Sequence, residues 1–333
     1  MTDRAGSVLG IGNAIVDVIA HRDDAFLEQN QLQKGIMTLI EEPQAESLYR
    51  QMQGAVTCSG GSVANTMVGL ASLRVNSVYV GKVKDDPLGK VYRADIQAAG
   101  VHSEVIAATE GPSTGRCMIF VTPDAQRTMG TFLGASAMLE PDDIRPEPIQ
   151  DADILILEGY LFDRKPARES FYKAARIAHA AQRKVAISLS DARCVERHLA
   201  DFRDLVAHHV DVVLANDAEV MALYQTEDLQ QALSLLRAQC ELAAVTLGAK
   251  GSLVVTPEQV IPIAAEPVQQ LVDTTGAGDL YAAGFLYGWV RGQAPAACGR
   301  MGSLVAAEIV QQFGARASGC LWSLLQHHQA GAC

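Results

Sequence analysis

The feature that most constrains this chain is a repeated alternation of short apolar runs and helix-length segments from about residue 150 onward. Apolar runs occupy residues 153–158, 184–189, 211–215 and 243–247, and such runs are typical of strands buried on both faces. Segments with helical period lie between them, at 167–182 and 229–240. The pattern predicts a doubly wound α/β fold, in which helices cover both faces of a mainly parallel sheet. Ligands of such sheets bind at the carboxyl ends of the strands.

The first third of the chain is less regular and predicts a second, smaller sheet. Segments 11–20, 35–40, 116–122 and 127–133 alternate in polarity or contain β-branched residues, as strands do. We expect several of them to form a small antiparallel sheet contributed by about residues 13–45 and 105–135. A sheet of this kind can close over a ligand as a lid. We treat residues 1–333 as a single domain that carries this lid, whose apolar face is also a candidate homodimer interface.

Composition and charge limit the classes of partner. The 333 residues carry 38 acidic and 27 basic side chains, a net charge of −11, so a surface adapted to nucleic acid or anionic membranes is not expected. The longest uncharged stretch, 51–73, is interrupted by polar residues and glycines, so no membrane span or signal peptide is predicted. The seven cysteines have no zinc-binding spacing, which fits reduced thiols in a cytoplasmic protein.

Three familiar motifs occur only in fragments. Gly10 and Gly12 follow an apolar stretch, but Ile15 replaces the third glycine of a dinucleotide fingerprint. An NAD-dependent oxidoreductase is therefore only an alternative from a different class. The Gly-x-Ser-x-Gly pattern around Ser113 leads into a strand-like run instead of the helix of a hydrolase elbow. No P-loop is present, so a kinase with this sequence needs another phosphate cradle.

The most informative segment is DTTGAGD, residues 273–279, which runs directly into an apolar stretch of helix length. Small residues before a buried helix leave backbone N–H groups free at its positive end, so Gly276, Ala277 and Gly278 form a candidate anion hole. Asp279 follows in the first helical turn. There a carboxylate can accept a proton from a hydroxyl group while the amides stabilise charge on a phosphoryl group. An ordinary glycine-rich loop with a first-turn acid is the simpler alternative.

Two segments nearer the amino terminus are candidates for binding a sugar-like diol. Gly61 precedes a predicted helix and lets the backbone approach a ligand closely, and Asn65, one turn inside, can both donate and accept hydrogen bonds. A capping or solvent-facing amide is the alternative. Asp17 interrupts an apolar run, where a buried carboxylate is costly unless it meets hydroxyl donors. A water-facing position on an edge strand is the other explanation.

Two further segments follow predicted strands of the main sheet. Asn216 and Glu219 stand one helical turn apart, which suits phosphate or metal-bound water. By themselves they are better explained as an N-cap with its capping-box acid. Thr246, Gly248 and Gly251 end another strand together with a lysine. This composition suits nucleotide phosphates but equally suits a tight hairpin.

Together these segments resemble the ribokinase-like (PfkB) family of carbohydrate and nucleoside kinases over most of the chain. The motifs that carry the resemblance are GGSVAN from Gly60, NDAE from Asn216, TLG from Thr246 and DTTGAGD from Asp273. Within that family the chain looks most like the adenosine kinase branch, on GIGNAIVD from Gly10, STG from Ser113, DAQR from Asp124, LS from Leu189 and VDVVLAN from Val210.

The resemblance implies a ribokinase-like domain with a β-sheet lid that uses ATP and Mg²⁺ to phosphorylate a primary hydroxyl group of a nucleoside or sugar. It also implies a monovalent cation, K⁺, as a family possibility near the loop from Asp273. Asp279 would be the general base, beside the anion hole of Gly276, Ala277 and Gly278. The remaining roles follow by position: acceptor binding at Asn13, Asp17, Gly61, Asn65, Arg127, Glu158 and Tyr160; ATP binding at Asn216, Thr246, Gly248 and Gly251; and Mg²⁺ binding, through water, at Glu219.

The sequence leaves the acceptor open. Adenosine, phosphorylated at its 5′-hydroxyl to AMP, is the leading candidate, with ribokinase-type or fructokinase-type sugars and inosine or guanosine as alternatives. Glu158 is typical of family members that bind a sugar hydroxyl, whereas the mammalian adenosine kinases have a small residue and aromatics there. The aromatic side chain needed to stack a purine would then be Tyr160 or Phe162. A catalytically silent nucleotide-binding protein on the same fold is a further alternative.

Overall fold

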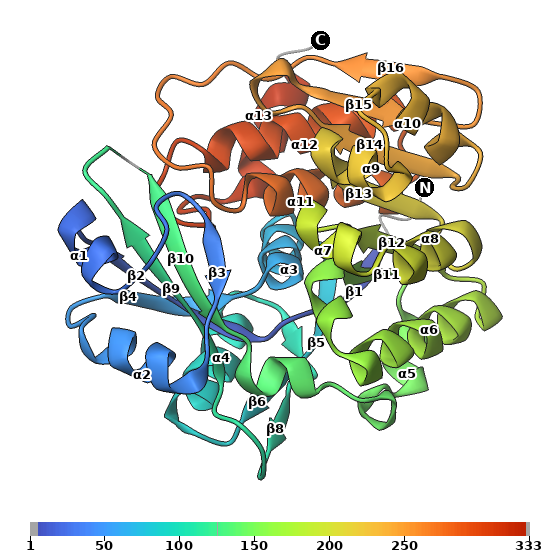
Figure 1. Cartoon of the computed structure of the whole chain (residues 1–333). Coiled ribbons are helices and arrows are strands. Elements are labelled where there is room, and N and C mark those ends of the chain that lie inside the picture. Colours follow the sequence, from blue (N-terminus) through green and yellow to red (C-terminus); the bar gives the residue numbers. More distant parts are fainter. Residues whose placement is uncertain (1–5, 125, 331–333) are drawn as a thin grey trace.

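A nine-stranded sheet runs through the larger part of the molecule, and the apolar runs of the sequence form its middle (Figure 1). This computed structural model describes residues 6–124 and 126–330; the chain ends and Ala125, which belong to the predicted domain and lid, lie outside them. The strand order is β16-β15-β14-β13-β12-β11-β1-β5-β7. The bounds are β1 (Ser7–Ile11), β5 (Asn76–Val80), β7 (His102–Ser103), β11 (Ile154–Glu158), β12 (Lys184–Ser188), β13 (Val212–Asn216), β14 (Leu242–Thr246), β15 (Ser252–Val255) and β16 (Val260–Ile263).

The pairing confirms the prediction of a mainly parallel sheet. All neighbours from β14 to β7 are parallel, and only β15 and β16 add antiparallel strands at one edge. Successive residues of one strand enter different cores: Ile154 and Ile156 pack on one side of the sheet, whereas Leu155 and Leu157 pack on the other. A strand that buries both faces needs this uninterrupted apolar sequence.

Helices cover both faces, as the doubly wound pattern predicts. One layer contains α3 (Ser62–Ser72), α4 (Pro87–Ala98), α11 (Ala277–Val290), α12 (Pro295–Ile309) and α13 (Leu321–Ala330). The other contains α5 (Pro146–Asp151), α6 (Lys165–Ala180), α7 (Ala192–Arg197), α8 (Leu199–His208), α9 (Asp217–Tyr224) and α10 (Leu229–Arg237). The predicted helices at 167–182 and 229–240 are α6 and α10. Among the helices of the described residues, none combines the length and apolar character that crossing a bilayer requires.

The second sheet projects beside the main domain as a lid (Figure 1). Its order is β3-β10-β9-β2-β4, with β2 (Ile15–His21), β3 (Met37–Leu39), β4 (Val56–Gly60), β9 (Gly115–Val121) and β10 (Arg127–Phe132). Helices α1 (Asp24–Gln29) and α2 (Glu42–Arg50) cover one face through Leu27 and Leu48. The opposite face carries Ile15, Ile119 and Met129.

Two details of the lid differ from the prediction. The sheet is mixed, not antiparallel, because β2 pairs with β9 and β3 with β10 in parallel. Segments far apart in sequence are not held to the antiparallel pairing that a tight hairpin imposes. In addition, β4 lies outside residues 13–45 and 105–135. Its sequence VTCSG carries little apolar character, so periodicity did not reveal it.

The segment 11–20, expected as one strand, is divided between the two sheets. Ile11 ends β1 in the main sheet, and Ile15 begins β2 in the lid. The three residues between them carry the chain across, with Asn13 at the crossing. The other short elements are β6 (Lys82–Lys84) paired with β8 (Ile106–Ala108) and the 3₁₀ helices η1 (Gly134–Met138), η2 (Pro141–Asp143), η3 (Gly159–Asp163) and η4 (Gly248–Lys250).

Phe162, one of the two aromatic residues expected to stack a purine, belongs to the core. Its ring is fully buried and stacks on Phe202, with centroids 3.9 Å apart and planes 12° from parallel, while Phe171 meets it edge-on. The expectation for Phe162 is therefore wrong, because its faces are taken by other rings.

We predict that Phe162→Ala lowers the free energy of unfolding by about 3–5 kcal/mol, since it empties a packed aromatic site. Urea denaturation followed by circular dichroism measures this loss. Leu235→Ala is the control, because Leu235 is 42% exposed and should cost less than about 1 kcal/mol. Equal stability losses in the two variants would contradict the buried position of Phe162.

Candidate active site

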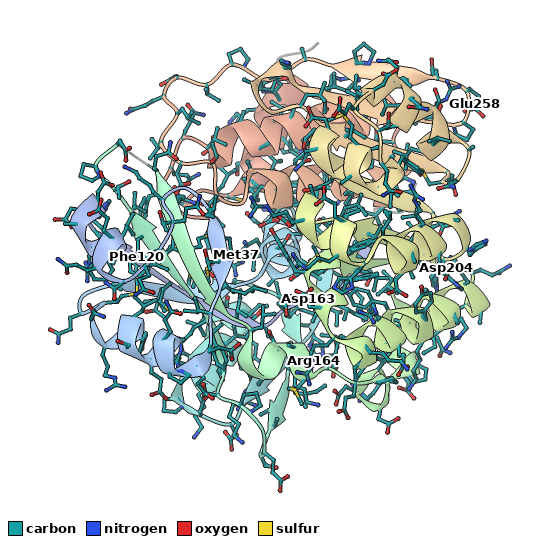
Figure 2. The ribbon with its side chains drawn as sticks, in the orientation of Figure 1. Met37, Phe120, Asp163, Arg164, Asp204 and Glu258 are labelled. Carbon is teal, nitrogen blue, oxygen red and sulfur yellow. The ribbon has the colours of Figure 1, made fainter. Side chains whose placement is uncertain are left out.

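A cavity of about 1340 Å³ lies where the inner face of the lid meets the carboxyl ends of the main strands. Met37 of the lid and Asp163 of the main domain both line this cavity. They lie on opposite sides of it (Figure 2). Ligand pockets usually measure about 300–1,000 Å³, so this cavity has room for two small molecules. Its position agrees with the rule that open α/β sheets bind ligands at their carboxyl edge.

Asp279 joins the starts of two buried helices inside this cavity. It lies in the first turn of α11, and α3 begins opposite it at Ser62. The Ser62 hydroxyl donates to Asp279 Oδ1 at 2.6 Å, and Asn65 Nδ2 donates to Oδ2 at 2.9 Å. The Thr66 hydroxyl also donates to the Asp279 backbone carbonyl at 3.0 Å. The carboxylate is thus held in one orientation within the cavity.

Burial raises the pKa of Asp279 to about 6, while the hydrogen bonds from Ser62 and Asn65 and the charge of Arg316 act in the opposite direction. A carboxyl group with this pKa is ionised at neutral pH and still basic enough to accept a proton during a reaction. Its properties therefore suit a general base.

The candidate anion hole beside Asp279 is partly free. Among the described residues, the N–H groups of Gly276 and Gly278 have no acceptor, whereas Ala277 N donates to the Thr274 carbonyl at 3.2 Å. The expectation of three free donors is thus corrected to two, because the turn before α11 uses the Ala277 amide. Gly276 has φ +72°, and a Cβ there would lie 2.7 Å from the Ala315 Cβ, so the close approach requires glycine.

The start of α3 depends on Gly61, which has φ +103°. A Cβ at this position would lie 2.1 Å from the Asn13 carbonyl oxygen. Asn65, one turn later, donates to Asp279, but its buried Oδ1 has no partner among the described residues. Its acceptor atom is therefore available to a ligand hydroxyl, and Asn65 is not a solvent-facing amide.

Asp17 is buried in the lid strand β2 and lines the cavity with 7% exposure. The alternative of a water-facing edge position is thus wrong. Burial raises the pKa of Asp17 to about 7; Arg316 and Arg127 lower it, and Asp279 raises it. Within the described part of the chain, no group donates a hydrogen bond to this carboxylate. Because burying an unpaired carboxylate is costly, the arrangement suits a ligand that brings hydroxyl donors.

Glu158 and Asn13 line the cavity but are bound mainly to each other. Asn13 Nδ2 donates to Glu158 Oε1 at 2.8 Å, Val63 N donates to Glu158 Oε2 at 2.9 Å, and the Ser136 hydroxyl donates to Asn13 Oδ1 at 2.9 Å. Burial raises the pKa of Glu158 to about 7. These two residues therefore brace the crossing from β1 to β2 against α3. Tyr160, which follows β11, also lines the cavity.

The predicted nucleotide end of the cavity contains Asn216, Glu219 and Thr246. Asn216 caps α9: its Oδ1 accepts from Glu219 N at 2.9 Å, and Glu219 Oε2 accepts from Asn216 N at 3.0 Å. Gly248 and Gly251 form the turn of the hairpin between β14 and β15 and do not line the cavity. The capping box and the hairpin are thus both present, and binding of nucleotide at these residues stays a prediction.

A metal site made of side chains alone is absent from the described residues, none of which form a group of three or more His, Cys, Asp or Glu suited to a metal. Mg²⁺ usually keeps several waters and binds substrate phosphates with one or two carboxylates. Glu219 accepts hydrogen bonds from Asn216 N and Nδ2, which leaves lone pairs on its carboxylate. The residues present therefore fit Mg²⁺ that arrives with a polyphosphate, bound to Glu219 through water. Burial raises the pKa of Glu219 to about 7.

Arg127 reaches from the lid strand β10 into the main domain. It forms an ion pair with Asp273, and both side chains are largely buried, at 11% and 1% exposure. Asp273 also accepts hydrogen bonds from Thr275 N at 2.7 Å and Gly314 N at 2.8 Å. The lid is thereby attached to the loop that contains the anion hole.

Sequence reasoning missed two polar residues of the site. Ser62 touches Asp279 directly, and its place immediately after the glycine pair at a helix start was the available signal. Arg316 donates to the Ser59 hydroxyl at 2.9 Å and to the Ser59 carbonyl, and its charge acts on both Asp17 and Asp279. No motif marks Arg316, because only the fold brings the segment after α12 against the lid strand β4.

A fixed carboxylate beside free backbone donors, at the start of a buried helix under a lid, is the arrangement that a phosphotransferase acting on a hydroxyl group requires. The comparisons with known proteins agree with this class. A model of the pfkB family of carbohydrate kinases matches residues 35–322, and the chain belongs to this family.

Three similar proteins carry names that refer to different acceptors. The structure of adenosine kinase from Sinorhizobium meliloti is 46% identical, with a TM-score of 0.91 over 97% of this chain and 99% of that one. A probable sugar kinase from Rhizobium etli is 42% identical, with a TM-score of 0.92 over 99% of both chains. An uncharacterized sugar kinase from Archaeoglobus fulgidus is 30% identical over 75% of this chain and 97% of its own. The chain is thus a sugar or nucleoside kinase.

We predict that Gly61→Ala both destabilises the fold and impairs turnover. The positive φ costs about 1–3 kcal/mol, and the contact with Asn13 displaces the start of α3, which orients Ser62 and Asn65. Gly54→Ala is the matched control, since Gly54 has φ +76° with no atom within 4 Å of an added Cβ. Urea denaturation should show a loss of stability in both variants. Steady-state kinetics should show a fall in kcat/KM of tenfold or more only in Gly61→Ala.

We also predict the pH dependence of activity. Because the base form of Asp279 disappears as the pH falls through its raised pKa, kcat/KM should decline on the acid side around pH 6. Ser62→Ala removes a hydrogen bond that favours the ionised carboxylate, so the decline should move to higher pH. Initial rates in buffers of constant ionic strength measure both profiles. A decline centred near pH 4, or one that Ser62→Ala leaves in place, would contradict the assignment.

Proposed function

We propose that this kinase uses ATP to phosphorylate the 5′-hydroxyl group of a nucleoside, with adenosine as the acceptor and AMP as the product. The observation that carries the proposal is that the cavity near Asp279 combines unpaired polar acceptors, on Asp17 and Asn65, with apolar side chains of the inner face of the lid, on which Asp17 also lies. A nucleoside has a matching combination of a polar ribose and an apolar base.

The unpaired polar acceptors suit the ribose. Asp17 has a buried carboxylate without a donor among the described residues, and Asn65 has a buried, unpartnered Oδ1. Two vicinal hydroxyl groups would donate to these oxygens and relieve the cost of burying them. A ribose bound there places its 5′-hydroxyl toward Asp279, which shares Asn65 as a hydrogen-bond partner.

The apolar side chains of the lid suit the base. The inner face of the lid lines the cavity with Ile15, Cys117, Ile119, Met129 and Leu133. A free sugar would leave this face exposed to water, whereas a purine would cover it and gain about 25 cal/mol for each Å² buried. Tyr160, which follows β11 of the main sheet, also lines the cavity and is an aromatic residue available to a base. Glu158, which favoured a sugar in the sequence, is occupied by Asn13 and Val63.

The chemistry then follows from the geometry. Asp279 accepts the proton of the 5′-hydroxyl while that oxygen forms a bond to the γ-phosphorus, and the bond from this phosphorus to the β,γ-bridging oxygen breaks to release ADP. The free N–H groups of Gly276 and Gly278 stabilise negative charge on the transferred group. The lid excludes water, which would otherwise compete with the acceptor. Mg²⁺ supplies charge neutralisation on the phosphates when bound, and a monovalent cation near Asp273 stays a prediction.

We expect Asp279→Asn to lower kcat by about 10²–10⁴-fold with little change in the KM of either substrate, because loss of a general base acts mainly on the chemical step. A coupled assay of ADP release measures turnover. Circular dichroism and thermal unfolding control for the loss of the Ser62 and Asn65 contacts. Near-normal turnover in this variant would remove Asp279 from the proposed role.

The acceptor is tested with a panel of adenosine, inosine, guanosine, ribose and fructose, each at saturating ATP and Mg²⁺. Adenosine should show a kcat/KM at least about 100-fold above that of ribose. The reason is that packing of the purine base against the lid contributes several kcal/mol to binding of the transition state. Ile119→Ala should reduce this preference and leave activity toward ribose unchanged. A preference for ribose or fructose would overturn the nucleoside assignment while leaving the kinase class intact.

A further inference from the structure

The cavity carries an imbalance of charge that matters for a polyanionic nucleotide. Among the described residues, the acids that line it are Asp17, Asp124, Glu158, Asp163, Asp191, Glu219, Asp273 and Asp279, and the cations are Arg127, Arg193 and Arg197. A chain of phosphates that enters this acidic cavity needs positive charge that other groups have not already neutralised. The question is which of the three arginines can supply it.

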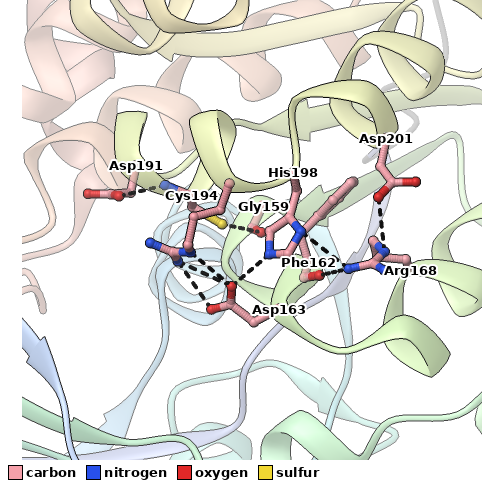
Figure 3. Close-up of polar contacts among 9 residues, drawn as sticks. Gly159, Phe162, Asp163, Arg168, Asp191, Cys194, His198 and Asp201 are labelled. Atoms are coloured by element: carbon pink, nitrogen blue, oxygen red, sulfur yellow. Dashed lines mark hydrogen bonds and ion pairs between the residues drawn. The ribbon is translucent and has the colours of Figure 1, made fainter.

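Two of the three arginines are paired. Arg127 forms its ion pair with Asp273. Arg197 donates to Asp163 from Nε at 3.3 Å and from Nη2 at 3.2 and 3.3 Å, so both carboxylate oxygens of Asp163 are used. His198 Nε2 also lies 2.8 Å from Asp163 Oδ1 (Figure 3). The fork of contacts neutralises Arg197 and fixes its orientation.

Arg193 is the arginine without a partner. It lines the cavity with an exposed side chain and makes no hydrogen bond or ion pair with any residue that the structure describes. Its backbone is nevertheless anchored. Asp191 caps α7 by accepting from Cys194 N at 2.9 Å, and the buried Cys194 thiol reaches the Gly159 carbonyl at 3.5 Å (Figure 3). An exposed guanidinium group without a protein partner, on an anchored backbone, is well suited to receive a ligand.

The topology puts Arg193 toward the nucleotide end of the cavity. Residues 189–191 follow β12, which lies directly beside β13, and β13 ends at Asn216. The charge of Asp191 acts on Glu219 and on Tyr160, so the end of β12 and the start of α9 face the same space. Arg193, two residues after Asp191, therefore lies at the edge of the sheet that carries the predicted nucleotide residues Asn216 and Glu219.

We propose that Arg193 binds the phosphate chain of the nucleotide and supplies the positive charge that a P-loop lysine, absent from this sequence, provides in other nucleotide-binding proteins. The planar guanidinium can contact two phosphate oxygens at once. This inference rests on the proposed use of ATP, but it does not depend on which acceptor receives the phosphoryl group.

The test is binding of MgATP to the full chain without acceptor, by isothermal titration calorimetry, in the wild type and three variants. Arg193→Gln should weaken MgATP binding about 10- to 100-fold, because charge-assisted hydrogen bonds to phosphate are lost. Arg193→Lys should restore part of the affinity, since it keeps the charge but not the fork. Arg197→Gln is the matched control on the same helix, and its effect should be less than about threefold because Asp163 already neutralises Arg197.

Steady-state kinetics then separate the outcomes. With whichever acceptor the wild type uses, Arg193→Gln should raise the KM for ATP and leave the KM for the acceptor unchanged. Unchanged MgATP affinity, or a rise confined to the acceptor KM, would overturn the role of Arg193 while leaving the proposed function standing. Failure of the wild type to bind MgATP would overturn both proposals.

Discussion

The carboxylate of Asp279 holds the structure of the site together because it joins two helix starts that are distant in sequence. Ser62 and Asn65 of α3 donate to its two oxygens, and Thr66 donates to its backbone carbonyl. Behind these contacts the helices pack closely, with Gly69 so near Ala283 that an added Cβ would lie 2.8 Å from the alanine methyl group. The proposed general base Asp279, the free amides at the start of α11 and Asn65 of α3 all take their positions from this junction.

A second constraint is the energy of buried charge. Burial raises the pKa values of Asp17, Glu158, Glu219 and Asp279 to about 6–7. Such groups are costly to bury unless donors reach them. Glu158 and Glu219 receive those donors from the protein, whereas Asp17 receives none from the described residues. The protein thus satisfies two of the buried acids itself and leaves Asp17, the acid proposed to bind the acceptor, without a donor from the described residues.

Much of the fold could be predicted because its signals are local. The apolar runs of β11 to β14 and the period of α6 fall within a few residues of their predicted bounds, since a strand buried on both faces and an amphipathic helix each impose a pattern on their own sequence. The lid was harder. Strand β4 is a short polar segment that becomes a strand only by pairing with β2. The tertiary structure, and not the local sequence, determines that pairing.

The site shows the same division. Glycine at positions 61 and 276 and the acid at 279 were visible in the sequence, because positive φ, bare amides and a first-turn carboxylate each demand particular residue types in a fixed order. The tertiary structure alone decided that Ser62 meets Asp279, that Ala277 is already bonded, and that Phe162 is enclosed by other rings. These outcomes depend on contacts between residues that are far apart in the sequence. The free energy of such a contact depends on both residues at once, so neither local segment predicts it.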